Sequence, residues 1–364
     1  MRINFLLPQV TLSGGVKSTF EITNRLMRKG HEVRIIYPLF SLSHGYPMYN
    51  LQKLPFRLIE TVYTLKRGNR VPWFKVESNM IRVPSFNEKF IPKADITVAT
   101  WWENAYHVNQ YSANKGVKVH IIRSYETWGG PKEKVDGSYK LPLNKIAIST
   151  YLKDIMKREF GVDDVPVIPN GLDLRKFYIE PEYKKHENIR VGLLYRRDTM
   201  KGMDEAIDAI QEIDQKFSGI TFVLFGEKIK DTHLKQINNL NKAEIHGFCL
   251  GEDLRHIYNS LDIFVFPSRF EGFGNPPLEA MACGVATITT KVGGIPDYCV
   301  SGETAIVIPP LDKESITNSI KRLIEDPKER DRISKDGGSK VKNYTWDNTV
   351  LELEKVFTTY LCHD

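Results

Sequence analysis

The stretch that decides the fold is residues 2–38, "RINFLLPQVTLSGGVKSTFEITNRLMRKGHEVRIIYP". Two short apolar runs, "RINFLLP" and "HEVRIIYP", flank a segment in which Val16, Phe20 and Leu26 recur at near-helical spacing. Gly30 follows that segment and predicts the end of the helix. A strand, a helix and a second strand form a βαβ unit, in which parallel strands require a helical crossover. The sequence therefore predicts an α/β fold with a parallel sheet.

The same alternation recurs along the whole chain of 364 residues. Further strand candidates are "ADITVAT", "VKVHIIR" and "KIAIS", and a second series runs from "VPVIPNGLD" through "IRVGLLY", "ITFVLFG", "AEIHGF", "DIFVFPS" and "VATITT" to "TAIVIPP". At roughly 150 residues per domain, we predict two doubly wound, Rossmann-like domains, residues 1–165 and 166–344. Such sheets bind ligands at the carboxyl ends of their strands, so two of them facing each other would form a cleft.

Composition narrows the function classes. The net charge of +6, from 51 basic and 45 acidic residues, is spread along the chain, so we expect no nucleic-acid partner. The four cysteines form no C-x-x-C pair and no zinc-ligand spacing with histidine, which favours reduced thiols and no metal site. No apolar stretch approaches the roughly 18 residues of a membrane span. We therefore expect a cytoplasmic protein.

The segment at residues 268–284, "SRFEGFGNPPLEAMACG", follows the apolar run "DIFVFP" and is built to hold a ligand. We expect a helix with Asn275 as its N-cap, which ends before Gly284. Gly272 and Gly274 would let a ligand approach the backbone amides at the helix start, an arrangement suited to a phosphate. Glu271 lies at the strand-to-helix turn, where functional groups concentrate.

The whole segment from residue 268 to 310 resembles the donor site of the retaining GT-B glycosyltransferases of family four, with two glutamates separated by seven residues. The resemblance implies that Glu271 contacts the hydroxyls of the donor sugar and that Glu279 binds the ribose hydroxyls of the nucleotide. It implies that the backbone amides of Phe273, Gly274 and Asn275 meet the diphosphate. It also implies that the terminal helix, residues 345–364, packs back on the first domain.

A basic loop in "LLYRRDTMKGMDEAI" would supply the opposite charge, because fixed cations stabilise a leaving diphosphate in the transition state. The resemblance maps the family's Gly-Arg and Lys-Gly onto Arg196 and Lys201. Tyr195 stands where the family has glycine, and Arg197 adds a second cation. Whether Arg196 or Arg197 faces the phosphate stays open. No metal is implied, because these cations fill the electrostatic role.

In the first domain, Gly14 and Gly15 resemble the family's first glycine-rich loop, which would bring a helix N-terminus to the diphosphate. The segment fits neither a Walker A loop nor a G-x-G-x-x-G fingerprint. Many relatives carry a histidine after a strand of this domain, but His120 lies inside the strand pattern and is interpreted as a core residue.

Candidate acceptor residues come from the same domain. Trp101 and Trp102, at the end of a strand, could stack on a carbohydrate, although core packing is the alternative. Tyr125 and Glu126 are candidates by position. Residues 54–70 form a basic amphipathic pattern that could lie on an anionic membrane or pack on its own domain.

The leading hypothesis is a retaining glycosyltransferase that moves a sugar from a nucleotide-diphosphate sugar to an acceptor hydroxyl. The acceptor would be a glycan or a lipid-linked saccharide in cell-envelope polysaccharide synthesis. One alternative is another GT-B enzyme, such as an inverting transferase or a sugar-nucleotide epimerase. The other is a non-catalytic protein that keeps the fold and binds a nucleotide-sugar.

Overall fold

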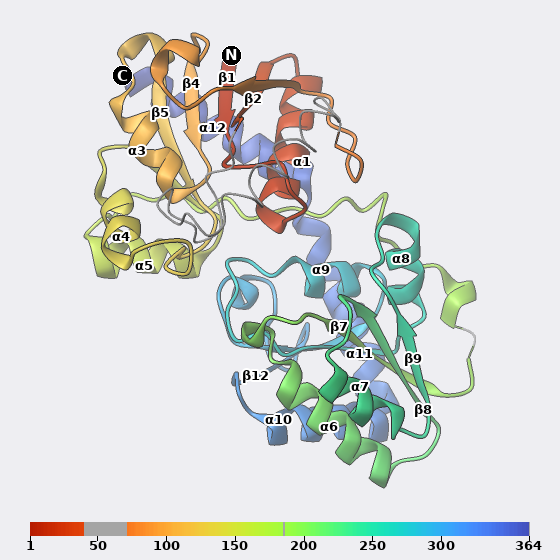
Figure 1. The fold of residues 1–364 in the computed structure, drawn as a ribbon. Helices are drawn as coiled ribbons and strands as arrows, with labels where there is room; N and C mark the ends of the chain where they lie inside the picture. The colour runs from red at the N-terminus through yellow and green to blue at the C-terminus, as the bar shows by residue number, and fades with distance from the viewer. Residues whose placement is uncertain (40–70, 185, 364) are drawn as a thin grey trace. The chain divides into compact units, whose positions relative to one another are not determined.

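A computed structural model describes residues 1–39, 71–184 and 186–363. The predicted amphipathic segment 54–70 lies outside the described residues. The chain divides into two compact units: residues 1–170 with 346–364, and residues 171–345. Figure 1 shows that each unit contains a parallel sheet with helices around it.

The first unit contains a six-stranded parallel sheet in the order β3-β2-β1-β4-β5-β6. Its strands are β1 (Arg2–Leu6), β2 (Glu32–Pro38), β3 (Asn79–Val83), β4 (Ile96–Ala99), β5 (Val117–Ile122) and β6 (Asn144–Ala147). Its main helices are α1 (Gly14–Arg28), α3 (Trp102–Gln110), α4 (Lys132–Lys140), α5 (Thr150–Phe160) and α12 (Trp346–His363). The βαβ unit predicted from residues 2–38 is confirmed as β1, α1 and β2, and Gly30 after α1 has φ +90°.

The second unit repeats this architecture with the order β12-β11-β10-β7-β8-β9. Its strands are β7 (Ile189–Tyr195), β8 (Ile220–Gly226), β9 (Ala243–His246), β10 (Ile263–Phe266), β11 (Ala286–Thr290) and β12 (Ile306–Ile308). Its helices are α6 (Met203–Lys216), α7 (Asp231–Asn238), α8 (Gly251–Asn259), α9 (Asn275–Ala282), α10 (Lys313–Glu325) and α11 (Pro327–Lys340). In each sheet the first strand of the unit is central: β1 lies between β2 and β4, and β7 lies between β8 and β10. The strand order therefore reverses beside β1 and beside β7.

The central strands are rich in apolar residues because helices cover both faces of a parallel sheet. In β8 every residue is buried, and Phe222 and Leu224 pack in the same core cluster as Ile207 and Ile210 of α6. The period of two in the strand and the helical spacing of α6 place both sets on the shared core.

The boundary between the units differs from the prediction by a few residues. The strand-like run "VPVIPN" was expected to open the second domain, but Val167 forms a bridge with Ala147 of β6. The Ile168 backbone N–H also donates to the Ala147 carbonyl at 2.8 Å. These hydrogen bonds attach the run to the sheet of the first unit, so the division falls after Asn170.

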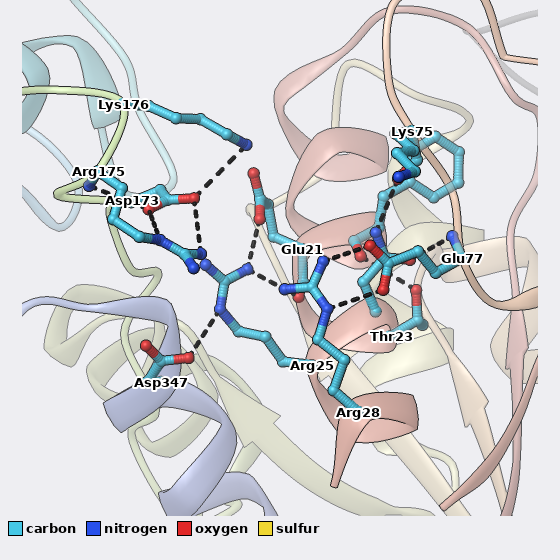
Figure 2. Close-up of polar contacts among 12 residues, drawn as sticks. Glu21, Thr23, Arg25, Arg28, Lys75, Glu77, Asp173, Arg175, Lys176 and Asp347 are labelled. Atoms are coloured by element: carbon cyan, nitrogen blue, oxygen red, sulfur yellow. Dashed lines mark hydrogen bonds and ion pairs between the residues drawn. The ribbon is translucent and has the colours of Figure 1, made fainter. Parts of the chain in front are cut away.

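Helix α12 returns the end of the chain to the first unit, where it contacts α1 (Figure 1). Its buried residues Val350, Leu353 and Phe357 lie on one helical face. Arg25 of α1 pairs with Glu21 one turn earlier, and its Nε donates to Asp347 Oδ1 of α12 at 3.0 Å (Figure 2). Because the Arg25 and Glu21 side chains are 6% and 5% exposed, this ion pair is buried and the two charges depend on each other.

Candidate functional site

The second unit places two site loops side by side. Strands β7 and β10 are parallel neighbours, with Leu193 opposite Val265, although 72 residues separate these positions. The strand order reverses at this pair, and ligands of doubly wound sheets bind at such a switch point, outside the carboxyl ends of the strands. The two loops that leave there, residues 196–202 and 267–274, carry most of the predicted donor-site residues.

Gly202 lets these two loops touch. It has φ +65°, and a Cβ built on it would lie 2.0 Å from the Pro267 carbonyl oxygen. The backbone N–H of Arg269 donates to the Met200 carbonyl at 2.8 Å across the same contact. Only glycine combines this conformation with this approach, so residue 202 fixes the distance between the loops.

The contact brings together Lys201 and Glu271. Lys201 Nζ lies 2.8 Å from Glu271 Oε1, and the Ser268 hydroxyl donates to the same oxygen at 2.8 Å. The two charged side chains are 24% and 15% exposed, so the pair is accessible without being fully solvated. Lys201 Nζ also donates to the Phe270 carbonyl at 3.5 Å. Glu271 is thereby a carboxylate of fixed orientation whose charge is offset by a lysine that keeps one more donor hydrogen.

The backbone of Glu271 is fixed from a third segment. Gly293 has φ +54°, and a Cβ built there would lie 1.9 Å from the Glu271 carbonyl oxygen. The next residue, Gly294, donates its N–H to the Gly272 carbonyl at 3.1 Å. The two glycines therefore hold the start of the "EGFGN" loop against the loop that follows β11.

The start of α9 differs from the prediction, because Gly274 and not Asn275 is the N-cap. Gly274 is left-handed with φ +86°, and a Cβ on it would lie 2.8 Å from Ile295 Cγ1. The hydroxyl of buried Tyr298 donates to the Gly274 carbonyl, which fixes that conformation. The Phe273 ring is buried against Tyr298, with ring centroids 5.4 Å apart, so only its backbone can serve a ligand.

Glu279 lies in the second turn of α9 and is 7% exposed. The Tyr258 hydroxyl donates to Glu279 Oε2 at 3.3 Å. Burial, and next the charge of Glu279, hold the pKa of Tyr258 well above its usual range, so the tyrosine stays a donor. The helix ends at Ala282 and is followed by Gly284 with φ +69°, as the sequence predicted.

The two arginines of the first loop differ in their partners. Arg196 Nε lies 2.9 Å from Glu227 Oε1, and both side chains are substantially exposed. The backbone N–H of Arg197 donates to Glu227 Oε2 at 2.8 Å. Within the described part of the chain, the Arg197 guanidinium forms no hydrogen bond or ion pair. Arg197 is therefore the cation that can bind an anion without breaking a pair.

Tyr195, which stands in place of the family's glycine, is fully buried. Its hydroxyl lies 2.8 Å from Nδ1 of buried His233 and accepts the Lys230 backbone N–H at 3.1 Å. His233 Nε2 lies 2.9 Å from Asp204 Oδ1 at the start of α6. This Tyr195–His233–Asp204 chain connects the end of β7 to α7 and to the start of α6. The basic loop, residues 196–202, runs from β7 to α6 and is therefore fixed at both ends. The sequence identified the substitution but gave no sign of this network.

In the first unit, Gly14 and Gly15 are the first two residues of α1, at the switch point next to β1. The Ser13 side chain caps the helix by accepting the Val16 N–H at 3.3 Å. No described heavy atom lies within 4 Å of a Cβ built on Gly14. The N-terminus of α1 is therefore open to a ligand.

The rings of Trp101 and Trp102 are 7% and 5% exposed, and this burial speaks against their stacking on an acceptor. They are covered by the loop after β5, in which a Cβ on Gly129 would lie 2.5 Å from the Trp101 ring. Trp102 Nε1 donates to the Gly129 carbonyl at 3.3 Å. The exposed ring of this cluster is Trp128, which is 56% exposed and lies 5.3 Å from Trp101 between centroids.

The other two acceptor candidates lie in different environments. The Tyr125 hydroxyl donates to Asp136 Oδ1 at 2.9 Å. Glu126 is buried, accepts the Trp102 N–H at 3.0 Å, and has its pKa raised by burial to about 8. His120 is 1% exposed and stacks on Tyr139, as expected for a core residue. The sequence analysis did not select Arg123. A cation directly after a buried strand is a pattern from which a candidate ligand-binding residue could have been predicted.

Comparison with known proteins assigns the second unit to a family. The model for "Glycosyl transferases group 1" matches residues 175–340, which span the whole site of the second unit. Residues 175–340 belong to the glycosyl transferases group 1. The capsular polysaccharide biosynthesis glycosyltransferase CapM of Staphylococcus aureus is 30% identical over 206 residues, which are 53% of each chain. The chain spans about half the length of the curated relatives it matches.

Solved structures show a likeness of fold over both units. Sucrose-phosphate synthase from Thermosynechococcus elongatus superimposes with a TM-score of 0.75 over 100% of both chains at 18% identity. HepE from Anabaena, solved in complex with UDP, gives a TM-score of 0.76 over 99% of this chain and 100% of its own at 16% identity. The fold is the GT-B fold with two Rossmann-like units, as the sequence predicted.

Among the helices within residues 1–39, 71–184 and 186–363, none has the length and apolar composition needed to cross a bilayer.

Proposed function

We propose that this chain is a retaining glycosyltransferase that transfers a sugar from a nucleoside-diphosphate sugar to an acceptor hydroxyl. The observation that carries the proposal is the Lys201–Glu271 pair, 2.8 Å apart at the switch point of the second unit. A carboxylate beside a diphosphate would repel it unless a cation stands between them. Lys201 meets that need, since its ammonium can keep Glu271 and still donate to a phosphate oxygen.

The remaining residues of the site have assigned roles in the proposal. Glu271 accepts hydrogen bonds from the donor sugar, and Glu279 accepts them from the ribose. The backbone at the start of α9 and the guanidinium of Arg197, with Arg196 beside it, stabilise the diphosphate as charge develops on it. No metal takes part in the proposed reaction.

The chemical step is a substitution at the anomeric carbon. The bond from that carbon to the leaving phosphate oxygen breaks, and a bond to the acceptor oxygen forms on the same face. The acceptor proton passes to the departing phosphate oxygen, so atoms and charge balance without a protein nucleophile. The protein contributes positioning and charge stabilisation, which are worth several orders of magnitude in rate.

Two similar proteins support the substrate classes. The solved complex of HepE with UDP supports a nucleotide donor. The name of CapM supports an acceptor that belongs to polysaccharide biosynthesis. Within the first unit, the exposed ring of Trp128 is the aromatic surface on which an acceptor sugar would stack.

The first experiment is thermal unfolding with UDP-, GDP-, ADP- and dTDP-sugars. A ligand at 100 times its dissociation constant stabilises the native state by about 2.7 kcal/mol. We expect one nucleotide series to raise Tm, and the matching sugar then serves in a turnover assay with product anomers assigned by NMR. An inverted product would refute the retaining mechanism.

The two glutamates can be separated by mutation. Glu271→Ala should lower turnover by at least about 100-fold while nucleotide binding survives. Glu279→Ala should weaken nucleotide binding first. Glu303→Ala, in an exposed turn of the same unit, is the control and should change neither. Wild-type turnover by Glu271→Ala would contradict the proposal.

A further inference from the structure

The first unit contains a buried cation that lacks a counter-ion. Arg123 directly follows β5 and is 8% exposed. Its Nη2 donates to the Thr19 hydroxyl at 3.0 Å. Its Nε and Nη1 are buried without a hydrogen-bond partner among the described residues. A buried guanidinium with two unsatisfied donors is costly, and such groups are normally paired.

The nearest acid does not fill this role. Glu126 lies three residues further along and influences Arg123 electrostatically, but the described residues include no ion pair between them. Its Oε2 is held by the Trp102 N–H at 3.0 Å. Burial raises the pKa of Glu126 to about 8, so this carboxyl is largely protonated at neutral pH and carries little negative charge.

Arg123 is aimed at the open start of α1. A Cβ built on Gly15 would lie 3.6 Å from Arg123 Cδ, and Thr19 stands one turn further along the same helix. The N-terminus of a 15-residue helix carries a partial positive charge and favours anions. Burial lowers the pKa of Arg123 to about 10, which leaves it charged at neutral pH. Two positive features therefore converge where no described side chain is negative enough to balance them.

We propose that Arg123 and the first turn of α1 form a binding site for an anionic oxygen group, a phosphate or a carboxylate, of a substrate. The planar guanidinium would donate to two oxygens of the anion through one fork, either Nε–H with the second Nη2–H or Nη1–H with that same Nη2–H. The naming of the ligand as a substrate rests on the proposed function; the binding of an anion does not. The source is either the diphosphate of the donor or an acidic group of the acceptor.

The test uses the full chain and inorganic phosphate and pyrophosphate as probes, at constant ionic strength set with chloride. We expect both probes to raise Tm of the wild type. Arg123→Met, which keeps most of the side-chain length without the charge, should weaken binding by about 10- to 100-fold. Arg123→Lys should give an intermediate loss, because it keeps the charge but not the paired donors.

A purely structural arginine predicts another pattern. Its removal would lower Tm without ligand and leave the phosphate-dependent shift unchanged, which would overturn the proposal. We expect the opposite: Arg123→Met should lower Tm little or not at all in the absence of phosphate, because the variant loses one hydrogen bond to Thr19 but also removes a buried charge that has no counter-ion. If this variant does not fold, Arg123→Lys carries the same comparison.

A Lys201→Ala variant separates the two sources and the two proposals. A phosphate shift that survives Lys201→Ala and is lost in Arg123→Met supports a site for an acidic acceptor group. A pyrophosphate shift that falls in both variants supports the donor diphosphate as the ligand. A shift that is unchanged in Arg123→Met refutes the site, whether or not any nucleotide-sugar is turned over.

Discussion

Gly293 gives the sharpest test of how the site is positioned. Its φ of +54° brings it against the carbonyl of Glu271, where a Cβ would lie 1.9 Å from the oxygen. Gly302 is a matched control nearby in the chain, with φ +76° and no described heavy atom within 4 Å of its Cβ position. The perturbation is therefore Gly293→Ala, compared with Gly302→Ala.

The magnitudes follow from these geometries. Both alanines would be left-handed, which costs about 1–2 kcal/mol in each variant. Only the alanine at 293 must also push Glu271 away, by about 1.5 Å, to reach the 3.4 Å at which ordinary contact begins. A misplacement of about 1 Å at a reacting centre costs about 100-fold in rate. Gly293→Ala should therefore lose about 100-fold in kcat, whereas Gly302→Ala should stay close to the wild type.

The assay is turnover of the nucleotide-sugar selected by thermal shift, with Tm measured on the same samples. A loss of Tm in both variants, larger in Gly293→Ala because of its clash, with kcat lost only in Gly293→Ala, would confirm that the glycine positions Glu271. Equal kcat in the two variants would refute the reasoning. A loss of kcat in both would show that backbone strain alone, and not the contact with Glu271, controls the rate.

Three further predictions test other parts of the two units. Glu126→Gln should remove a pH dependence of the free energy of unfolding. Because the pKa of Glu126 is raised from 4.5 in the unfolded chain to about 8 in the folded one, its contribution to stability is complete below pH 4.5. That contribution falls, by up to about 1.4 kcal/mol per pH unit, as the pH rises towards about 8. Urea unfolding of both proteins across this range measures the difference, and parallel curves would contradict the assignment. Tyr195→Phe removes the hydroxyl from the chain that holds the basic loop, so we expect weaker nucleotide binding than in the wild type by calorimetry, and an unchanged dissociation constant would assign the chain to stability alone. Arg25→Ala should lower the free energy of unfolding by about 3–5 kcal/mol, because it removes the buried cation that pairs with Glu21. Arg28→Ala removes a more exposed pair (Figure 2) and should cost less than about 1 kcal/mol. Similar losses in chemical unfolding would refute the buried character of the first pair.

The sequence was sufficient to predict the second sheet and most of the first, because apolar runs of strand length and helical spacing are local patterns. It predicted β1, α1 and β2 from residues 2–38, and the strands that carry the donor loops from runs such as "DIFVFP". It did not predict β3, whose run "NMIRV" is short and interrupted by an arginine. Spacing and composition also predicted the site segment itself, since glycine, proline and paired glutamates have local conformational meaning.

The placement of the unit boundary required long-range hydrogen bonds. The run around Val167 has a strand-like composition in either unit, and only its pairing with β6 assigns it to the first. The N-cap of α9 was missed by one residue for a related reason. Asparagine is the better local N-cap, but contacts from Ile295 and Tyr298 select the left-handed glycine before it.

What the sequence by itself determined is the chemistry of each residue and the local element that carries it: a carboxylate after β10, cations after β7, and glycines at helix starts. The tertiary structure decided which of these meet. Lys201 and Glu271 lie 70 residues apart in sequence and 2.8 Å apart in space, because β7 and β10 are neighbours at the switch point. The tertiary structure also decided that Trp128 is exposed while Trp101 is buried. It buried Arg123 without a counter-ion among the described residues. Burial and pairing depend on parts of the chain that are remote in sequence, so no local pattern records them.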